Sequence, residues 1–270
     1  MDNNFVLLEN VTYGNHVRHK VDVFIPEKVK SPQGLILFIH GGGWQAGDKT
    51  AHHPDAEYFC NKGYISASMN YRYVDESITV YDELDDVKSA LETIKNECAK
   101  NGFNIEKVIL SGGSAGAHLS LMYAYTRKEN SPLTPVAVGA YCPPVDCASP
   151  DFCLGLSKEF EDWKYGVLSC CTGVKITKND FMCKSQQEAL RKMSPQQYLT
   201  EDCVPTAVFQ GIQDELVPFG EVVNFVKMLG EKGIKNDFVI YENSNHALDK
   251  DPDKSLESKK IIEEYAEMYF

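Results

Sequence analysis

The sequence predicts an α/β fold, in which a doubly wound, mostly parallel β-sheet carries helices on both faces and a cap insertion. Apolar strand-like runs alternate with amphipathic helical segments along most of the 270 residues, which is typical of parallel sheets. This alternation stops at about residue 143 and resumes at about residue 200. The length suits one large domain of this class. We therefore expect residues 1–270 to form a single domain with a cap at about 143–200.

The first half of the chain is predicted to begin with a hairpin at one edge of the sheet. Alternating apolar residues at 5–13 and 21–25 indicate its two strands. The continuous apolar run Leu35–Ile39 is typical of a strand that is covered on both faces. Apolar residues at helical spacing predict a long helix over 82–100. The remaining elements predicted here are a helix at 55–62 and strands at 64–69 and 108–110.

The second half is predicted to hold the insertion between two regular stretches. A strand at 136–141 precedes it, and helix-like pieces lie near Phe160 and Gln187. Strands at 206–210 and 238–241 and helices at 221–230 and 255–269 follow it. Because the apolar residues of the insertion must be buried somewhere, we expect them to form a lid. These residues are Phe152, Leu154, Leu156, Phe160, Trp163, Tyr165, Leu168 and Phe181.

A Gly-Gly-Ser-Ala-Gly run at 112–116 stands between the strand at 108–110 and a helix that begins near Ala117. A Gly-x-Ser-x-Gly sequence at such a junction is a nucleophile elbow, in which a tight turn lifts the serine hydroxyl out of the sheet. The sequence therefore predicts Ser114 as a nucleophile.

A second motif, His-Gly-Gly-Gly-Trp at 40–44, directly follows the strand at 35–39. Consecutive glycines cost conformational entropy, so a folded chain keeps them where the backbone approaches something closely or adopts positive φ. Acyl transfer needs such a place, because backbone N–H donors stabilise the oxyanion of the tetrahedral intermediate. We predict that the N–H groups of Gly42, Gly43 and Ala115 form this oxyanion hole.

With these motifs, the chain resembles the hormone-sensitive-lipase-like branch of the α/β-hydrolases, the small bacterial esterases and lipases. The resemblance extends from Val21 to the C-terminal helix and includes Asn-Tyr-Arg at 70–72, Gly-x-x-Asp-x-x-Val-Pro at 211–218 and the late His246. It implies the α/β-hydrolase fold and a serine hydrolase whose triad follows the order serine, acid, histidine.

The base is predicted to be His246, which lies in a polar loop just after the strand at 238–241. In open α/β sheets, chemistry is assembled at the carboxyl ends of the strands. Asp214 matches the acid of the family motif and would orient and stabilise the imidazole. Asp249 is the alternative acid, although it lies close to His246 in sequence.

The other histidines are expected to have structural or solvated positions. His16 and His19 lie in a polar turn, His52 and His53 precede a helix, His118 has a packing role, and His40 holds the glycines. Trp44 either walls the substrate pocket or packs behind the glycine loop. Arg72 is expected to brace that loop through an ion pair with Asp48 or with Asp85 or Asp86.

The bulk composition argues against several partners. A net charge of −12 does not favour nucleic acids or anionic membranes, which attract basic patches. The N-terminus lacks a signal-peptide pattern, and no apolar run approaches a membrane span. We expect a cytoplasmic protein with a small-molecule ester substrate, no cofactor and no bound metal, and a homodimer is left open.

The nine cysteines are predicted to be mostly reduced, because an odd number in a long chain does not suggest a disulfide framework. Six of them lie between 142 and 183 without Cys-x-x-Cys spacing or a histidine, which disfavours zinc. We expect them to pack as small apolar groups, with Cys170 and Cys171 the most reactive.

Three functions are compatible with the motifs. The first is a carboxylesterase that hydrolyses short-chain acyl esters, among them carbohydrate or phenolic esters, through an acyl-enzyme. The second is an amide hydrolase such as an arylformamidase or a small serine peptidase, although no propeller typical of oligopeptidases is visible. The third is a non-catalytic small-molecule receptor, which the presence of Ser114, Asp214 and His246 argues against.

Overall fold

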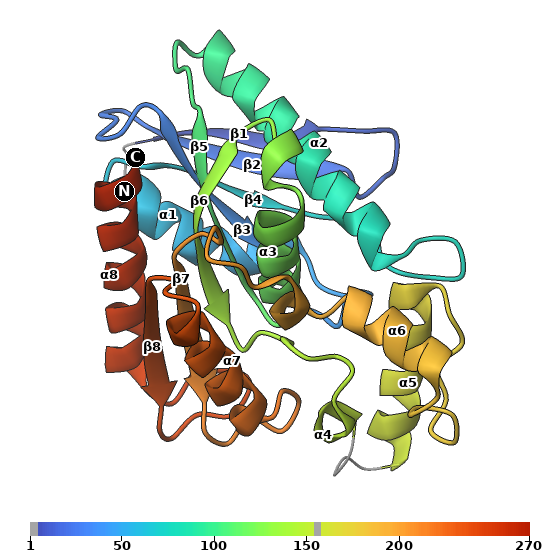
Figure 1. Cartoon of the computed structure of the whole chain (residues 1–270). Coiled ribbons are helices and arrows are strands. Elements are labelled where there is room, and N and C mark those ends of the chain that lie inside the picture. The colour runs from blue at the N-terminus through green and yellow to red at the C-terminus, as the bar shows by residue number, and fades with distance from the viewer. Residues whose placement is uncertain (1–4, 154–157) are drawn as a thin grey trace.

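A computed structural model describes residues 5–153 and 158–270. Within them, eight strands form one sheet in the order β1-β2-β4-β3-β5-β6-β7-β8 (Figure 1). The strands are β1 Phe5–Thr12, β2 Lys20–Pro26, β3 Gly34–Ile39, β4 Ile65–Met69, β5 Lys107–Gly113, β6 Thr134–Tyr141, β7 Thr206–Gly211 and β8 Asn236–Tyr241. Strands β3 to β8 are parallel to one another, and β1 and β2 form an antiparallel hairpin at one edge. The predicted sheet and its leading hairpin are confirmed.

Helices cover both faces of this sheet. The helices are α1 His53–Asn61, α2 Val80–Lys100, α3 Ala115–Thr126, α7 Phe219–Glu231 and α8 Pro252–Tyr269. Apolar residues of α2, α3 and α7 belong to one buried cluster, and those of α1 and α8 belong to the other (Figure 1). Alternate residues of β3 enter each cluster, Leu35 and Leu37 the first and Ile36 and Phe38 the second. This explains why β3 reads as a continuous apolar run.

Helix α2 begins earlier than its apolar pattern predicts. Thr79 and Asp82 form a capping box, with Asp82 Oδ2 accepting from Thr79 N at 2.8 Å. The box satisfies N–H groups that have no partner within the helix, so the helix begins at Val80. The described helices include none that is both long and apolar enough to cross a membrane.

The insertion lies beside the carboxyl ends of the parallel strands (Figure 1). It contains α4 Pro150–Cys153, α5 Lys158–Thr172, α6 Lys184–Lys192 and a 3₁₀ turn, Pro195–Tyr198. Four of the apolar residues that were expected to be covered are buried, namely Phe152, Tyr165, Leu168 and Phe181. Phe160 and Trp163 are instead 49% and 39% exposed. Leu154 and Leu156 lie outside the described residues.

The parallel direction of β3 to β8 gathers the predicted functional residues at one edge. The glycine loop follows β3, Ser114 follows β5, Asp214 follows β7 and His246 follows β8. Because parallel strands end on the same side of a sheet, loops that are far apart in the sequence meet there.

Candidate active site

Ser114 occupies a tight turn between β5 and α3. Its backbone has φ 54° and ψ −119°, a conformation that is uncommon for a residue with a side chain. A Cβ at Gly112 would lie 2.4 Å from the carbonyl oxygen of Ile39, and one at Gly116 would lie 1.9 Å from the same atom. Both flanking glycines are therefore required because the turn packs directly on the end of β3.

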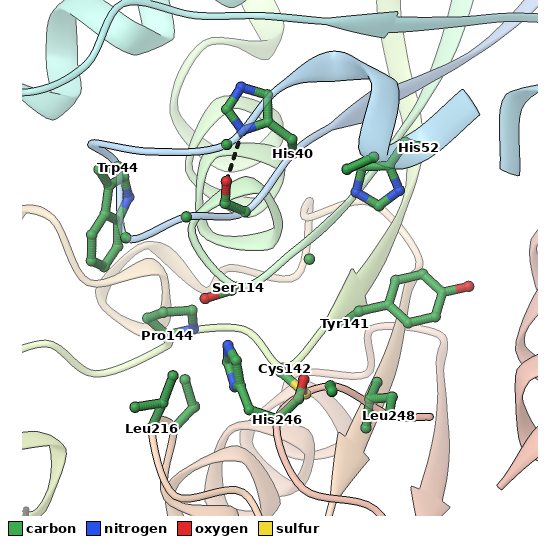
Figure 2. A pocket seen from close by; sticks show the side chains of 18 of the residues that line it. His40, Trp44, His52, Ser114, Tyr141, Cys142, Pro144, Leu216, His246 and Leu248 are labelled. Carbon is green, nitrogen blue, oxygen red and sulfur yellow. Dashed lines mark hydrogen bonds between the residues drawn. The ribbon is translucent and has the colours of Figure 1, made fainter. Parts of the chain in front are cut away.

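The glycine loop after β3 is held in a defined shape. Gly42 and Gly43 have φ values of 120° and 58°, which favour glycine. Nδ1 of His40 donates to the carbonyl oxygen of Gly41 at 2.7 Å (Figure 2). This contact confirms that His40 holds the glycines.

The three predicted oxyanion donors lack a protein acceptor in the described part of the chain. For the N–H groups of Gly42, Gly43 and Ala115, no acceptor is recorded among the described residues. Gly42 and Gly43 line the pocket described below, whereas Ala115 begins α3 directly after Ser114. Unpaired N–H groups at a helix start and in a glycine loop are suited to an anionic oxygen.

Arg18, which the sequence analysis did not single out, fastens the glycine loop to the leading hairpin. Its Nε donates to the carbonyl oxygen of Tyr71 at 2.7 Å, and its Nη2 donates to that of Gly47 at 3.1 Å. Nη2 also lies 3.1 Å from Nε2 of His40. Arg72 pairs with Asp86, as predicted, at 2.7 Å. The hydrogen bonds of Arg72 among the described residues all go to α2, to the Asp86 carboxylate and the carbonyl oxygen of Asp82, so they do not support the expected bracing of the glycine loop.

His246 and Asp214 form a directly bonded pair. His246 Nδ1 lies 2.8 Å from Oδ2 and 2.9 Å from Oδ1 of Asp214. The carboxylate also accepts the backbone N–H groups of Leu216 and Val217, both at 2.9 Å. Burial raises the pKa of Asp214, but the hydrogen bond from His246 and these N–H donors outweigh it and hold that pKa below its usual value.

This pairing sets the tautomer of His246. With Nδ1 donating to Asp214, Nε2 carries the free lone pair that a general base needs. In Figure 2, the ring rises toward Ser114 within the same pocket. Among the described residues, no hydrogen bond joins Ser114 Oγ to His246, and apo sites often show such looser geometry. Asp249 is exposed and does not contact His246, so Asp214 is the acid that the structure pairs with it.

The other histidines have different partners. His118 is fully buried, as expected for a packing role. His16 is exposed, His52 bonds Asp55 at 2.8 Å and His53 bonds Asp22 at 2.8 Å. His19 was expected to lie in a solvated turn, but it forms a hydrogen bond of 3.1 Å with Asp86, and its ring lies 4.8 Å from that of Tyr13. That contact joins segments 67 residues apart, which no local pattern could reveal.

Trp44 both lines the pocket and packs behind the glycine loop. Its side chain is 3% exposed, and its Nε1 donates to Nδ1 of His118 at 3.2 Å. Nε2 of His118 lies 2.6 Å from the carbonyl oxygen of Met193, at the end of the insertion. A neutral imidazole accepts on one nitrogen and donates on the other, so His118 connects the glycine loop to the insertion only while it is uncharged.

We expect protonation of His118 to weaken the fold in acid. Burial lowers its pKa from 6.5 to about 4, so between these values the unfolded chain binds more protons than the folded one. Stability is then complete above pH 6.5 and falls as pH drops toward 4. Urea unfolding should show the stability advantage of wild type over His118→Gln shrinking by about 2 kcal/mol between pH 7 and pH 4.5. Parallel pH profiles for the two proteins would contradict this.

A cavity of about 700 Å³ connects these groups. Ser114 and His246 lie in it, with Trp44, Pro144 and Leu216 on one side and His52, Tyr141 and Leu248 on the other (Figure 2). Helices α4 and α5 add Phe152, Trp163 and Lys164 to its wall. A cavity of this size accommodates a small organic substrate.

Cys142 is the only cysteine among the described lining residues, and it lies beside the acid and histidine. Potential ligand atoms of Cys142, Asp214 and His246 lie within 4.8 Å of one another, so this set could hold a metal ion. Burial and the neighbouring Asp214 raise the pKa of the Cys142 thiol well above its usual value. Because thiolate is the metal-binding form, the arrangement favours the hydrogen-bonded pair over a metal centre.

The described cysteines are all free thiols, and six of the nine are buried. Four of the six between 142 and 183 are buried, Cys142, Cys147, Cys153 and Cys171, which agrees with the expected packing as small apolar groups, whereas Cys170 and Cys183 are only partly buried. The expectation that Cys170 and Cys171 are the most reactive is not supported. Cys171 is buried, and burial raises the pKa of Cys170. Cys183 is half-buried, and a hydrogen bond with Ser185 lowers its pKa, which favours the reactive thiolate there instead.

Two family models match successive parts of the chain. Residues 21–146 match the BD-FAE family, and residues 172–270 match the prolyl oligopeptidase family. The first match contains the glycine loop and Ser114, and the second contains Asp214 and His246. Solved esterases align with this fold over nearly the whole chain. The chain has the α/β-hydrolase fold.

Two solved structures illustrate the fold likeness. A truncated carbohydrate esterase from gut microbiota aligns with a TM-score of 0.76 at 19% identity, covering 96% of this chain and 99% of that one. Esterase 2 of Thermogutta terrifontis, solved with propionate bound, aligns with a TM-score of 0.71 at 22% identity, covering 99% and 95%.

Curated relatives of the chain include named ester hydrolases. A probable carboxylic ester hydrolase, LipM of Mycobacterium tuberculosis, is 26% identical over 89% of this chain and 56% of its own length. A probable isoprenylcysteine alpha-carbonyl methylesterase of Arabidopsis thaliana is 22% identical over 88% of this chain and 50% of its own. The chain therefore spans about half the length of these two relatives.

Proposed function

We propose that this α/β-hydrolase is a serine carboxylesterase that cleaves short-chain acyl esters through an acyl-enzyme. The observation that carries the proposal is the bonded Asp214–His246 pair, whose imidazole lies in one pocket with Ser114 and the glycine loop. The ester hydrolases among its relatives support it.

In the proposed reaction, Ser114 Oγ attacks the ester carbonyl carbon while His246 Nε2 takes the hydroxyl proton. The oxyanion is stabilised by the N–H groups of Gly42, Gly43 and Ala115. His246 then gives the proton to the leaving alkoxide, which departs as an alcohol, and the acyl group stays on Ser114. A water molecule, deprotonated by His246, attacks this acyl group and releases the acid. The insertion at 143–200 is proposed to act as the cap that limits water access.

A panel of p-nitrophenyl esters from acetyl to decanoyl tests this function. We expect the highest kcat/KM among the short chains, and inactivation by a phosphonate ester that labels Ser114. Methyl ferulate and acetylated sugars, assayed beside the panel, examine the phenolic and carbohydrate substrates. Lack of turnover for every ester would refute the proposal.

Amide hydrolysis is a second candidate, because residues 172–270 match the prolyl oligopeptidase family. The same residues would perform it, with an amine as the leaving group. N-Formylkynurenine and a proline p-nitroanilide distinguish the two candidates. A kcat/KM for either amide above that of every ester would favour amide hydrolysis.

A further inference from the structure

The pocket wall contains a buried lysine that the proposed reaction does not use. Lys164 lies on α5, lines the same cavity as Ser114 and is only 4% exposed. Lysine is almost never fully buried unless its charge is paired, since removing an ammonium group from water is costly. Its presence here therefore requires an explanation from its contacts.

The Lys164 ammonium group has two recorded hydrogen-bond acceptors, both of them neutral. Nζ donates to the carbonyl oxygen of Phe152 and, at 2.7 Å, to that of Leu216. It also lies 3.7 Å from the centre of the Phe152 ring. An ammonium group has three N–H donors, so one donor has no recorded acceptor in the described part of the chain. These contacts fix the position of Nζ but do not compensate the positive charge of the ammonium group.

The other basic groups of the pocket differ from Lys164 in this respect. His246 pairs with Asp214, and both His52 and Lys259 pair with Asp55 at 2.8 Å. His40 has no carboxylate partner, but burial lowers its pKa to about 4, so it is neutral near pH 7. Among the lining residues that the structure describes, Lys164 is thus the one cation without a carboxylate within ion-pair distance.

We propose that Lys164 is a specificity-determining residue that binds a carboxylate group of the substrate. This inference rests on the proposed function and narrows it to esters that carry an acidic group on an apolar chain or ring. Phe152 and Trp163, which both precede Lys164 in the sequence, line the same pocket and would contact that apolar part. The carboxylate would accept the remaining N–H donor and supply the missing counter-charge, a strong, charge-assisted hydrogen bond.

Binding to a Ser114→Ala protein tests the inference without hydrolysis. The two tryptophans of the chain, Trp44 and Trp163, both line the pocket, so intrinsic fluorescence reports occupancy. Two ligand pairs place the acid on either side of the ester: ethyl hydrogen glutarate with ethyl pentanoate, and 4-acetoxybenzoate with its methyl ester. We expect the acid of at least one pair to bind about tenfold more tightly than its neutral partner.

The preference is expected to depend on Lys164. In the Ser114→Ala protein, adding Lys164→Met should bring the ratio of acid to neutral affinity to about one. Adding Lys158→Met, at an exposed lysine on the same helix, should leave that ratio unchanged. Lys164→Gln replaces Lys164→Met if thermal unfolding shows that the latter does not fold. In the Ser114-containing enzyme, the corresponding ratio of kcat/KM values should fall about tenfold, mainly through KM.

The preference should also decrease as pH rises through 8. Burial lowers the pKa of Lys164 to about 8, against the opposing effects of Cys153, Cys147, Asp214 and Glu221. Only the protonated form carries the charge, so the acid loses its advantage above that pH while the neutral ligand does not. The Lys164→Met protein should show no such change.

The outcomes separate this inference from the proposed function. Equal affinity for acid and neutral ligands, or a preference that survives in folded Lys164→Met, overturns the role of Lys164 alone. Hydrolysis of neutral esters would still support the esterase in that case. Conversely, Lys164-dependent binding of acids by a protein that hydrolyses no ester would leave this site standing and refute the esterase.

Discussion

Replacing Ser114 with alanine should lower kcat for p-nitrophenyl butyrate on the order of 10⁴- to 10⁶-fold, because the members of a triad act as a unit. The variant lacks the oxygen that forms the acyl bond, while the glycine loop and the Asp214–His246 pair remain. Stopped assays with long incubation measure the residual rate, and intact mass spectrometry checks that phosphonate no longer adds to the protein.

Ser120→Ala is a matched control for this substitution. Ser120 lies on α3, six residues after Ser114, and its hydroxyl donates only to the carbonyl oxygen of Gly116 in its own helix. Its removal should leave kcat within a few-fold of wild type. Substantial esterase activity in Ser114→Ala, together with phosphonate labelling at another residue, would show that the nucleophile is elsewhere.

The second large effect is expected for Asp214→Asn, which should reduce kcat about 10⁴-fold. Asparagine is nearly the same size, but its amide can present an N–H group to His246 Nδ1. The ring would then place its proton on Nε2, where a lone pair is needed to accept from Ser114. Loss of the carboxylate also removes the charge that stabilises the imidazolium.

Asp249→Asn is the control for the assignment of Asp214 as the acid, because Asp249 lies in the same loop as His246 but is exposed. It should retain nearly full activity, and thermal unfolding should show that both variants are folded. If Asp249→Asn were the more damaging change, the acid would have been misassigned despite the 2.8 Å contact of Asp214 with His246.

The strands and helices of the regular part of the fold were predictable, because the local pattern of apolar residues in the sequence indicates them. Strand β3 is buried on both faces and reads as an apolar run, and α2 places apolar residues at helical spacing. The positions of Ser114, Asp214 and His246 were also predictable, because a parallel sheet brings the loops after its strands to one edge. Element ends were less certain, since capping contacts such as that of Thr79 with Asp82 decide them.

The supporting contacts were not predictable, because they join side chains far apart in the sequence. Arg18 reaches a carbonyl 53 residues away, and His19 reaches an acid 67 residues away. Lys164 did carry a local signal, since it falls at helical spacing with the buried Leu168 and Cys171. A lysine on an apolar helix face is easily dismissed as a solvated charge, and only the packed structure shows what surrounds it.

The contacts of Arg18 have a consequence for local unfolding. The hairpin of β1 and β2 lies at the edge of the sheet, and its outer strand β1 has β2 as its one strand neighbour, so this end of the sheet is expected to open most readily. Arg18 donates hydrogen bonds to the carbonyl oxygens of both Gly47 and Tyr71. Opening of that edge therefore also releases the loop around Gly42 and Gly43. Amide hydrogen exchange should therefore group this loop with the N-terminal strands as one foldon. The structural order of the glycine loop then depends on a part of the sheet that does not contact the substrate.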